Sequence, residues 1–119
     1  MCLTIEIYFS AFTPSFAKSP LQIKMLAALN GNITIPCNPQ AAPAPQITWL
    51  KDGIELSVPL YSTVDSNIGA HRLLNGHLII TKVTLGDAGV YTCRATNDLG
   101  EADSSTELTV ASKFDLPYP

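Results

Sequence analysis

The most reactive side chains in this chain of 119 residues are three cysteines, Cys2, Cys37 and Cys93. Cysteines can bind metals, act as nucleophiles or pair as disulfides, and an odd number leaves at least one unpaired within the chain. The sequence has no Cys-x-x-Cys motif and no cysteine–histidine cluster, so a zinc site is not expected. Cys2 has no neighbouring base, and we expect it to be inert or a remnant of a preceding domain.

The two histidines, His71 and His77, are candidates for acid–base chemistry. A serine hydrolase needs a serine, a histidine and a carboxylate that converge in a pocket. The sequence contains no Gly-x-Ser-x-Gly motif, and the two histidines flank a predicted turn, where solvated side chains are expected. We therefore predict no catalytic residue, no metal and no cofactor.

Asn32 begins the N-glycosylation sequon Asn32-Ile33-Thr34. The apolar–polar alternation of this segment places Asn32 on the outward face of a strand, from which a glycan could reach solvent. We expect Asn32 to be glycosylated if the protein is secreted. The alternative is an ordinary strand asparagine.

The composition indicates one domain built from many short elements. The chain is 46% hydrophobic and 14% charged, with nine prolines and seven glycines, which favours strands joined by turns over helices. The formal net charge of −3 argues against a nucleic-acid partner, which would favour a basic surface. The apolar runs are too short for a membrane-spanning helix.

Apolar residues alternate with polar ones in several segments, a pattern that predicts strands. These segments are residues 21–26, 31–37, 46–53, 71–83, 89–97 and 101–110, and the fourth contains a hairpin turn at Asn75-Gly76. Residues 54–70 show no regular pattern, and one helical turn is expected near 85–88. Such short strands, with turns about every 8 to 12 residues, predict an all-β sandwich of two antiparallel sheets.

The predicted strands place Cys37 and Cys93 on inward faces, with the single tryptophan, Trp49, between them in the chain. A disulfide that joins the two sheets, with the indole packed on it, fits this order. Closing such a loop contributes about 4 kcal/mol in the chain-entropy model. Tyr91, two residues before Cys93, is expected to direct its hydroxyl back to the backbone just upstream. The other core residues singled out are Leu78 and Ile80.

A longer set of residues has the spacing of a known family. The set consists of Cys37, Trp49, Leu78, Ile80, Val83, Asp87, Ala88, Gly89, Tyr91, Cys93, Ala95, Asn97, Gly100, Ala102, Leu108 and Val110. Over about residues 20–110 it resembles an immunoglobulin domain of the intermediate (I) set. Within it, "IPCNPQAAPAPQITWLKDG" resembles the B–C region of contactin-type neural cell-adhesion molecules. The resemblance implies an immunoglobulin-like two-sheet antiparallel sandwich.

The resemblance also implies that the chain is a fragment of a longer array. Residues 1–14, with alternating apolar residues, would be the closing strand and linker of a preceding domain. Residues 15–111 would be the I-set domain and residues 112–119 a linker tail. In this family an arginine that opens the fourth strand usually pairs with the aspartate of the Asp-Ala-Gly motif. Arg72 lies closer to Leu78 than expected, so Asp87 could instead cap its own turn.

The function implied by the resemblance is non-catalytic. The domain would mediate protein–protein interaction, homophilic or heterophilic, at the extracellular cell surface as part of a longer chain. Its neighbours would be immunoglobulin or fibronectin-type domains, with no small-molecule substrate. The alternatives are a structural domain of an intracellular muscle-type array and the immunoglobulin portion of a secreted matrix protein. Paired cysteines and a sequon favour the extracellular readings, because disulfides persist in oxidising compartments.

Two surfaces are expected to contact the partner. The first is the outward face of the strands that contain Leu50 and Arg94, together with Thr48 and Thr92, which the alternation directs away from the core. The second is the turn that contains Asn97 and Asp98. Arginine is enriched at protein interfaces, whereas a single exposed leucine is ordinary, so a merely solvated face is the alternative.

Overall fold

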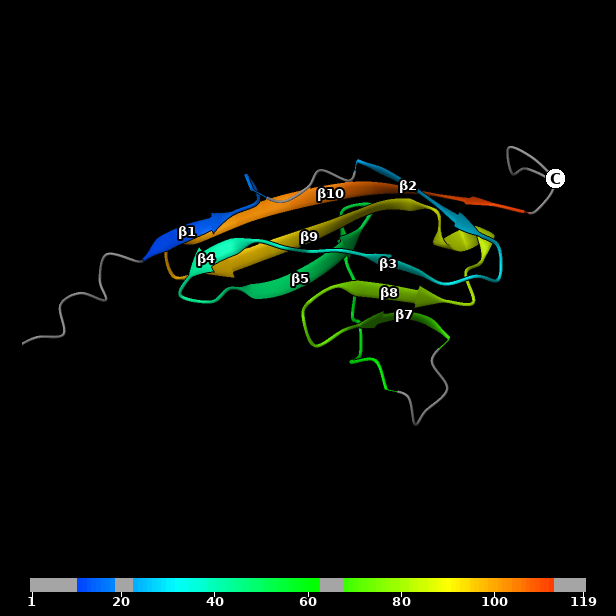
Figure 1. Cartoon of the computed structure of the whole chain (residues 1–119), viewed down its shortest axis with the longest axis horizontal. Helices are drawn as coiled ribbons and strands as arrows, with labels where there is room; N and C mark the ends of the chain where they lie inside the picture. The colour runs from blue at the N-terminus through cyan, green and yellow to red at the C-terminus, as the bar shows by residue number, and fades with distance from the viewer. Residues whose placement is uncertain (1–10, 19–22, 63–67, 113–119) are drawn as a thin grey trace, which may run out of the picture.

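The computed structural model describes residues 11–18, 23–62 and 68–112, which form two layers of β-strands (Figure 1). The larger layer is a five-stranded sheet in the order β2 (Lys24–Ala28), β10 (Gly100–Ala111), β9 (Gly89–Asn97), β5 (Gln46–Lys51) and β6 (Ile54–Glu55). The smaller layer is a three-stranded sheet in the order β3 (Ile33–Ile35), β8 (Leu78–Thr81) and β7 (Gly69–Arg72). β1 (Phe12–Ser15) pairs with β4 (Gln40–Ala42), and a 3-10 turn, η2 (Leu85–Asp87), precedes β9.

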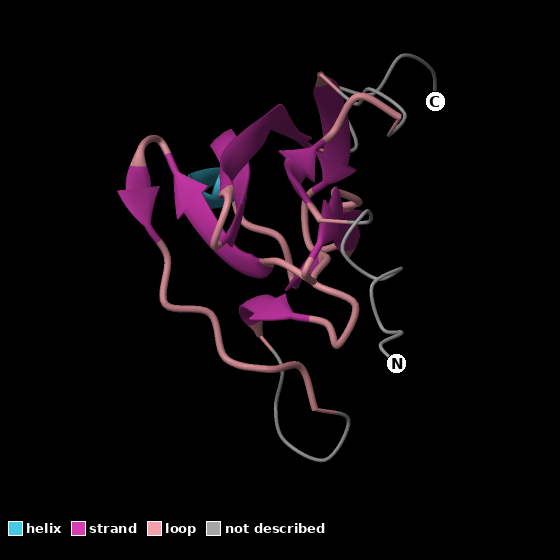
Figure 2. Cartoon of the chain, turned by 90° about the vertical axis from the view of Figure 1, so that its left-hand side faces the viewer, coloured by secondary structure: helices cyan, strands magenta, loops and turns pink. Residues whose placement is uncertain are grey.

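The predicted all-β sandwich of two sheets is therefore confirmed. One strand pair departs from the antiparallel expectation, because β2 runs parallel to β10 with Leu108 opposite Met25. Alternation in a sequence indicates the two faces of a strand but not the direction of its neighbour. Figure 2 views the layers from the end at which β1 lies, with η2 in cyan. Within the three described ranges, no helix is long and apolar enough to cross a membrane.

The β7–β8 hairpin closes at the turn that the sequence predicts. The amide of Gly76 donates to the carbonyl of Leu73 at 2.9 Å, and the amide of Leu73 donates to the carbonyl of His77 at 2.9 Å. Gly76 has a φ of 92°, a conformation that costs glycine little. Between residues 54 and 70, the described part contains β6, an isolated bridge between Leu60 and Arg72, and the first two residues of β7.

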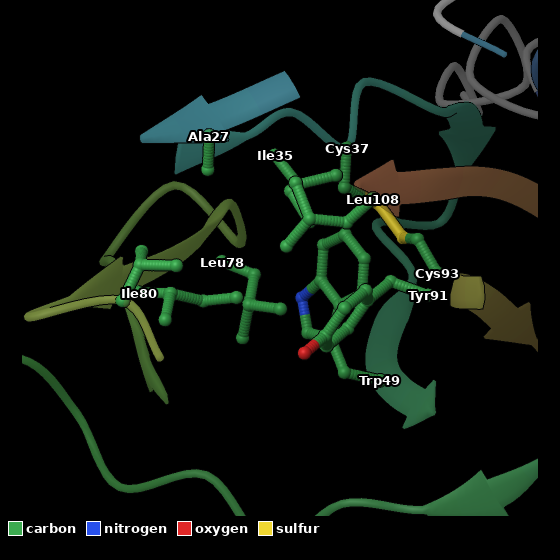
Figure 3. Packing of buried hydrophobic residues seen from close by; sticks show 10 residues of the cluster. Ala27, Ile35, Cys37, Trp49, Leu78, Ile80, Tyr91, Cys93 and Leu108 are labelled. Carbon is green, nitrogen blue, oxygen red and sulfur yellow. A yellow bond between two sulfur atoms is a disulfide. The ribbon is translucent and has the colours of Figure 1, made fainter. Parts of the chain in front are cut away.

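The core lies between the two layers and is centred on Trp49 (Figure 3). Cys37 and Cys93 form a disulfide with a Cα–Cα distance of 6.2 Å, within the usual range of about 4.4–6.8 Å. Trp49 is 1% exposed and lies opposite Cys93 in the β5–β9 register. Leu78 and Ile80 are completely buried. The predicted disulfide, its tryptophan and the inward residues of the hairpin are thus confirmed.

The N-terminal end of the described chain is tied to the sandwich through β1. Pro14 is buried, and the carbonyl of Phe12 accepts a hydrogen bond of 2.9 Å from the side-chain amide of Asn97. β1 and the end of β10 lie at opposite ends of the molecule (Figure 1). The predicted boundary between residues 14 and 15 falls within β1. Residues 1–10, with Cys2 and the predicted preceding strand, and residues 113–119 lie outside the described residues.

Two N-terminal deletions should separate the preceding segment from β1. Removing residues 1–10 should leave the urea midpoint nearly unchanged, since the sequence assigns them to a preceding domain. Removing residues 1–15 should cost about 1–3 kcal/mol, because it deletes the β1–β4 ladder and the bond to Asn97. If the shorter deletion were as costly as the longer one, residues 1–10 would be part of this domain.

Candidate functional site

The predicted contact face is assembled on the outward side of β5, β9 and β10. Thr48 lies opposite Arg94, and Arg94 lies opposite Asp103. The Arg94 guanidinium donates from Nε and Nη2 to the two carboxylate oxygens of Asp103, at 2.9 and 3.0 Å. These hydrogen bonds raise the pKa of Arg94 above its ordinary value. Arg94, whose side chain is 37% exposed, is thus already paired within the domain, and such surface pairs contribute little to stability.

Leu50 does not contribute the exposed apolar contact that the sequence predicts, and this part of the prediction is wrong. Its side chain is only 8% exposed. Leu50 lies opposite Thr92 of β9 on one side and Glu55 of β6 on the other, so neighbouring strands flank it on both sides. Alternation alone could not reveal that the short β6 extends the sheet past β5. The outward face is consequently polar, with the Thr92 and Ser105 hydroxyls 2.8 Å apart.

In the turn between β9 and β10, the side chain of Asn97 forms hydrogen bonds to the backbone of neighbouring segments. The side-chain nitrogen of Asn97 donates to the carbonyls of Phe12 and Pro43, at 2.9 and 3.1 Å. Its side-chain oxygen accepts from the amide of Leu99 at 2.9 Å. Asp98 and Leu99 remain exposed, Leu99 by 51%. Leu99 is thus an exposed apolar residue within the predicted turn, in which the sequence pattern had singled out Asn97 and Asp98.

The two histidines are partnered rather than solvated, which corrects the sequence prediction. Both are half-buried. The Nε2 of His77 lies 3.1 Å from the side-chain oxygen of Asn38, and the ring of His71 meets Tyr61 edge-on with the ring centroids 6.0 Å apart. Among the residues that the structure describes, no three histidine, cysteine or acidic side chains gather where they could hold a metal ion.

Asn32 is exposed, as the sequon requires for modification. Its side-chain oxygen accepts a hydrogen bond of 3.3 Å from the amide of Lys82. This hydrogen bond involves only the oxygen and not the side-chain nitrogen, the atom to which a glycan is attached. The geometry is therefore compatible with glycosylation.

Several short hydrogen bonds between side chains and backbone lie around the turn before β9. The hydroxyl of Tyr91 donates to the carbonyl of Asp87 at 2.6 Å, as the sequence predicts. The carboxylate of Asp87 accepts from the amide of Thr84 at 2.8 Å, so Asp87 caps its own turn. Asp52 performs a similar task, because its carboxylate accepts from the amide of Val90 at 2.9 Å. The carboxylate of Asp87 is thus used locally, without the Arg72 partner that is usual in the resembled family.

Tyr91 is the described group whose protonation is most clearly altered by the fold. Burial, followed by the charges of Asp87 and Asp52, raises its pKa from 10.0 to about 12. The folded state therefore holds the phenolic proton more tightly than the unfolded chain. This contribution to stability is complete below pH 10 and is lost as the pH rises through about 12.

Changing Tyr91 to Phe should test both the hydrogen bond and this pKa. At pH 7 the variant should lose about 1 kcal/mol of unfolding free energy, because the bond to the carbonyl of Asp87 is removed. The difference between the two proteins should shrink above pH 10, where only the wild-type chain can ionise at this position. Urea unfolding at pH 7, 9, 10 and 11 measures this difference. A difference that stays constant up to pH 11 would contradict the raised pKa.

The chain is similar in sequence to a known domain family and to several known proteins. A model of the immunoglobulin I-set domain matches residues 14–110. Contactin of Drosophila melanogaster is 40% identical over 103 residues, which are 85% of this chain and 7% of that protein. Contactin-1a of Danio rerio is 39% identical over 113 residues, which are 93% of this chain and 10% of that protein. The chain thus spans about a tenth or less of the relatives it matches.

Solved structures with the same fold come from several kinds of array. Immunoglobulin domains 1–4 of Sidekick-1 match with a TM-score of 0.69 and 28% identity, over 83% of this chain and 24% of that one. A titin I-band fragment matches with a TM-score of 0.66 and 26% identity, over 84% of this chain and 33% of that one. The fold alone therefore does not separate adhesion proteins from structural arrays.

Proposed function

Because this chain belongs to the immunoglobulin I-set family, we propose that it is a non-catalytic module that mediates protein–protein interaction within a cell-adhesion or receptor protein. The observation that carries the proposal is its identity of 39–40% to contactins over 85–93% of its length. The same assignment follows from the likeness of its B–C region to contactin-type neural cell-adhesion molecules. The partner is a protein, bound homophilically or heterophilically.

The polar chemistry of the described residues supports a binding module rather than an enzyme. Asp52 and Asp87 hold backbone amides, and Asn97 joins two loops. Tyr91 is buried, with its hydroxyl bonded to the backbone. Each of these groups is already bonded to the backbone at a turn or strand end, which is a structural role rather than that of a group poised to react.

An extracellular, cell-surface location is part of the proposal. The Cys37–Cys93 disulfide is of the kind that persists in oxidising compartments, and Asn32 is exposed within a sequon. Neighbouring immunoglobulin or fibronectin-type domains would flank this one in the same chain. The likeness to titin is the observation that favours the alternative, a structural domain of an intracellular array. In a reducing cytosol, however, the disulfide would not be expected to persist.

Expression in secretory cells should distinguish these two locations. We expect the secreted chain to carry a glycan on Asn32, visible as a mass increase that peptide-N-glycosidase removes. The variant Asn32→Gln should lack the increase, whereas Asn30→Gln, a nearby asparagine outside any sequon, should retain it. An unmodified secreted chain would remove the glycan from the proposal. A chain that is stable only with its cysteines reduced would favour the intracellular alternative.

The proposed contact surfaces are the outward face around Arg94 and the turn with Asp98 and Leu99. Leu50 and Asn97 support these surfaces structurally, since one is buried and the other is bonded to three backbone groups. Binding by one isolated domain is expected to be weak, because arrays gain avidity by linking several modules. The whole array is therefore the right object for a binding test.

Charge exchange offers a test of the outward face that preserves its internal ion pair. We expect Arg94→Asp combined with Asp103→Arg, made in the full-length protein, to weaken cell aggregation or partner binding at least about tenfold. Leu99→Asp tests the turn in the same assay, and Lys24→Glu, an exposed charge change on β2, serves as the matched control. Normal binding by both test variants, with normal surface display, would remove these two surfaces from the proposal.

A further inference from the structure

A groove that no sequence motif indicated lies between β5 and the β7–β8 turn. Its volume is about 690 Å³, and the segment that follows β3 forms its third side. The lining residues used below are Asn38, Gln46, Ile47, Arg72, Leu74 and Asn75. The groove meets the outward face around Arg94 at Thr48, which belongs to both, but Arg94 itself is not part of the lining.

Arg72 is the cation of this groove, and its orientation follows from the strand register. Ala70 packs against the core, and Arg72 follows it by two residues on β7, opposite the fully buried Leu78. The Arg72 side chain therefore starts on the core-facing side of β7, which is an edge strand, and it is half-buried. Among residues 11–18, 23–62 and 68–112, no side chain forms an ion pair or a hydrogen bond with its guanidinium.

The other arginine of the chain shows what Arg72 lacks. Arg94 donates two hydrogen bonds to one carboxylate, that of Asp103. The described lining of the groove contains no aspartate or glutamate. A half-buried guanidinium has lost part of its hydration and is stabilised by acceptors that replace it. The groove is thus a locally cationic site on a chain whose formal net charge is −3.

The walls of the groove are held in place without a ligand. The indole nitrogen of Trp49 donates to the carbonyl of Gly76 at 2.9 Å in a buried bond, which joins the hairpin turn to β5. His77 and Asn38 are in hydrogen-bond contact at 3.1 Å, which joins the same turn to the segment after β3. Because both bonds lie within the domain, little ordering entropy has to be lost when a ligand enters.

We propose that this groove receives the carboxylate of an aspartate or glutamate side chain that projects from a protein partner, with Arg72 as its anchor. A carboxylate matches the guanidinium in plane and accepts two parallel hydrogen bonds. The side-chain amides of Gln46 and Asn75 supply further donors at the exposed edge. This inference rests on the proposed function, which it deepens by naming the chemistry of the partner.

A few apolar residues within a mostly polar lining favour a peptide over an acidic sugar as the carrier of the carboxylate. Leu74 is 89% exposed, and Ile47 and Pro45 are also part of the lining. Such residues can pack against the aliphatic part of a loop that flanks the acidic side chain, as in the apolar centre of protein interfaces. A sugar would present mainly hydroxyl groups to these side chains.

Peptide selection on the 119-residue chain tests the proposal without knowledge of the partner. A random peptide library displayed on phage is selected on the wild-type chain, and the selected peptides are synthesised in acidic and amide forms, with Glu or Asp changed to Gln or Asn. We expect enrichment of one acidic position. Its conversion to the amide, or Arg72→Gln in the domain, should each weaken binding at least about tenfold, and the two changes together should add little more.

Matched variants distinguish the loss of the Arg72 charge from a loss of folded structure. Lys24→Gln should leave peptide binding unchanged because Lys24 is an exposed cation on β2 outside the lining of the groove, and Arg72→Lys should retain part of the affinity. Trp49 fluorescence and the urea midpoint show whether Arg72→Gln remains folded. Peptides without an acidic position, equal binding to a folded Arg72→Gln variant, or no selected peptide at all would overturn the proposal.

An acidic sugar and the failure of the wider proposal give different results. If 3′-sialyllactose binds through Arg72 while no acidic peptide does, the carboxylate comes from a glycan and the protein partner assigned here is wrong. If the acidic peptides fail but the Arg94–Asp103 exchange abolishes partner binding by the full-length protein, the groove is excluded and the proposed function stands. If the unmodified full-length protein bound no protein partner at all, the proposed function itself would be contradicted.

Discussion

The rest of the structure depends on one contact between the two sheets, the Cys37–Cys93 disulfide packed with Trp49. The disulfide joins the segment after β3 to β9, and Trp49 lies on β5 beside the same sulfur pair. The two sheets contribute the surrounding apolar residues, including Leu78 and Leu108. An interior of this kind is closely packed, so a change in the volume or position of the indole would be felt on both sheets.

The same tryptophan connects the core to the surface at which we propose binding. Its ring is buried, yet its nitrogen donates to the carbonyl of Gly76 in the β7–β8 turn. That turn forms one wall of the groove that contains Arg72. A core residue therefore positions an exposed structure, and the recognition site gains rigidity from the folding free energy of the domain rather than from the ligand.

Side chains that resembled binding candidates in the sequence proved to have partners within the domain because of where their neighbours lie. Asn97 bonds to carbonyls contributed by two segments that are distant in sequence, and Arg94 bonds to Asp103 across the β9–β10 hairpin. Leu50 is covered by the strands on either side of it. The reverse holds for Arg72. Asp87, the usual partner of an arginine in this family, caps its own turn through Thr84, as the sequence suggested, which leaves the Arg72 guanidinium for the groove.

The sequence by itself determined the alternation of the strands, the inward phase of both cysteines, Trp49 and Tyr91, and the turn at Asn75-Gly76, because these follow from local periodicity and turn chemistry. It could not determine the burial of Leu50, the internal bonds of Asn97, or the groove around Arg72. Those features depend on which strands lie side by side and on their register. Period-two alternation assigns a side chain to a face of its strand, but only the packing of distant segments decides what lies against that face.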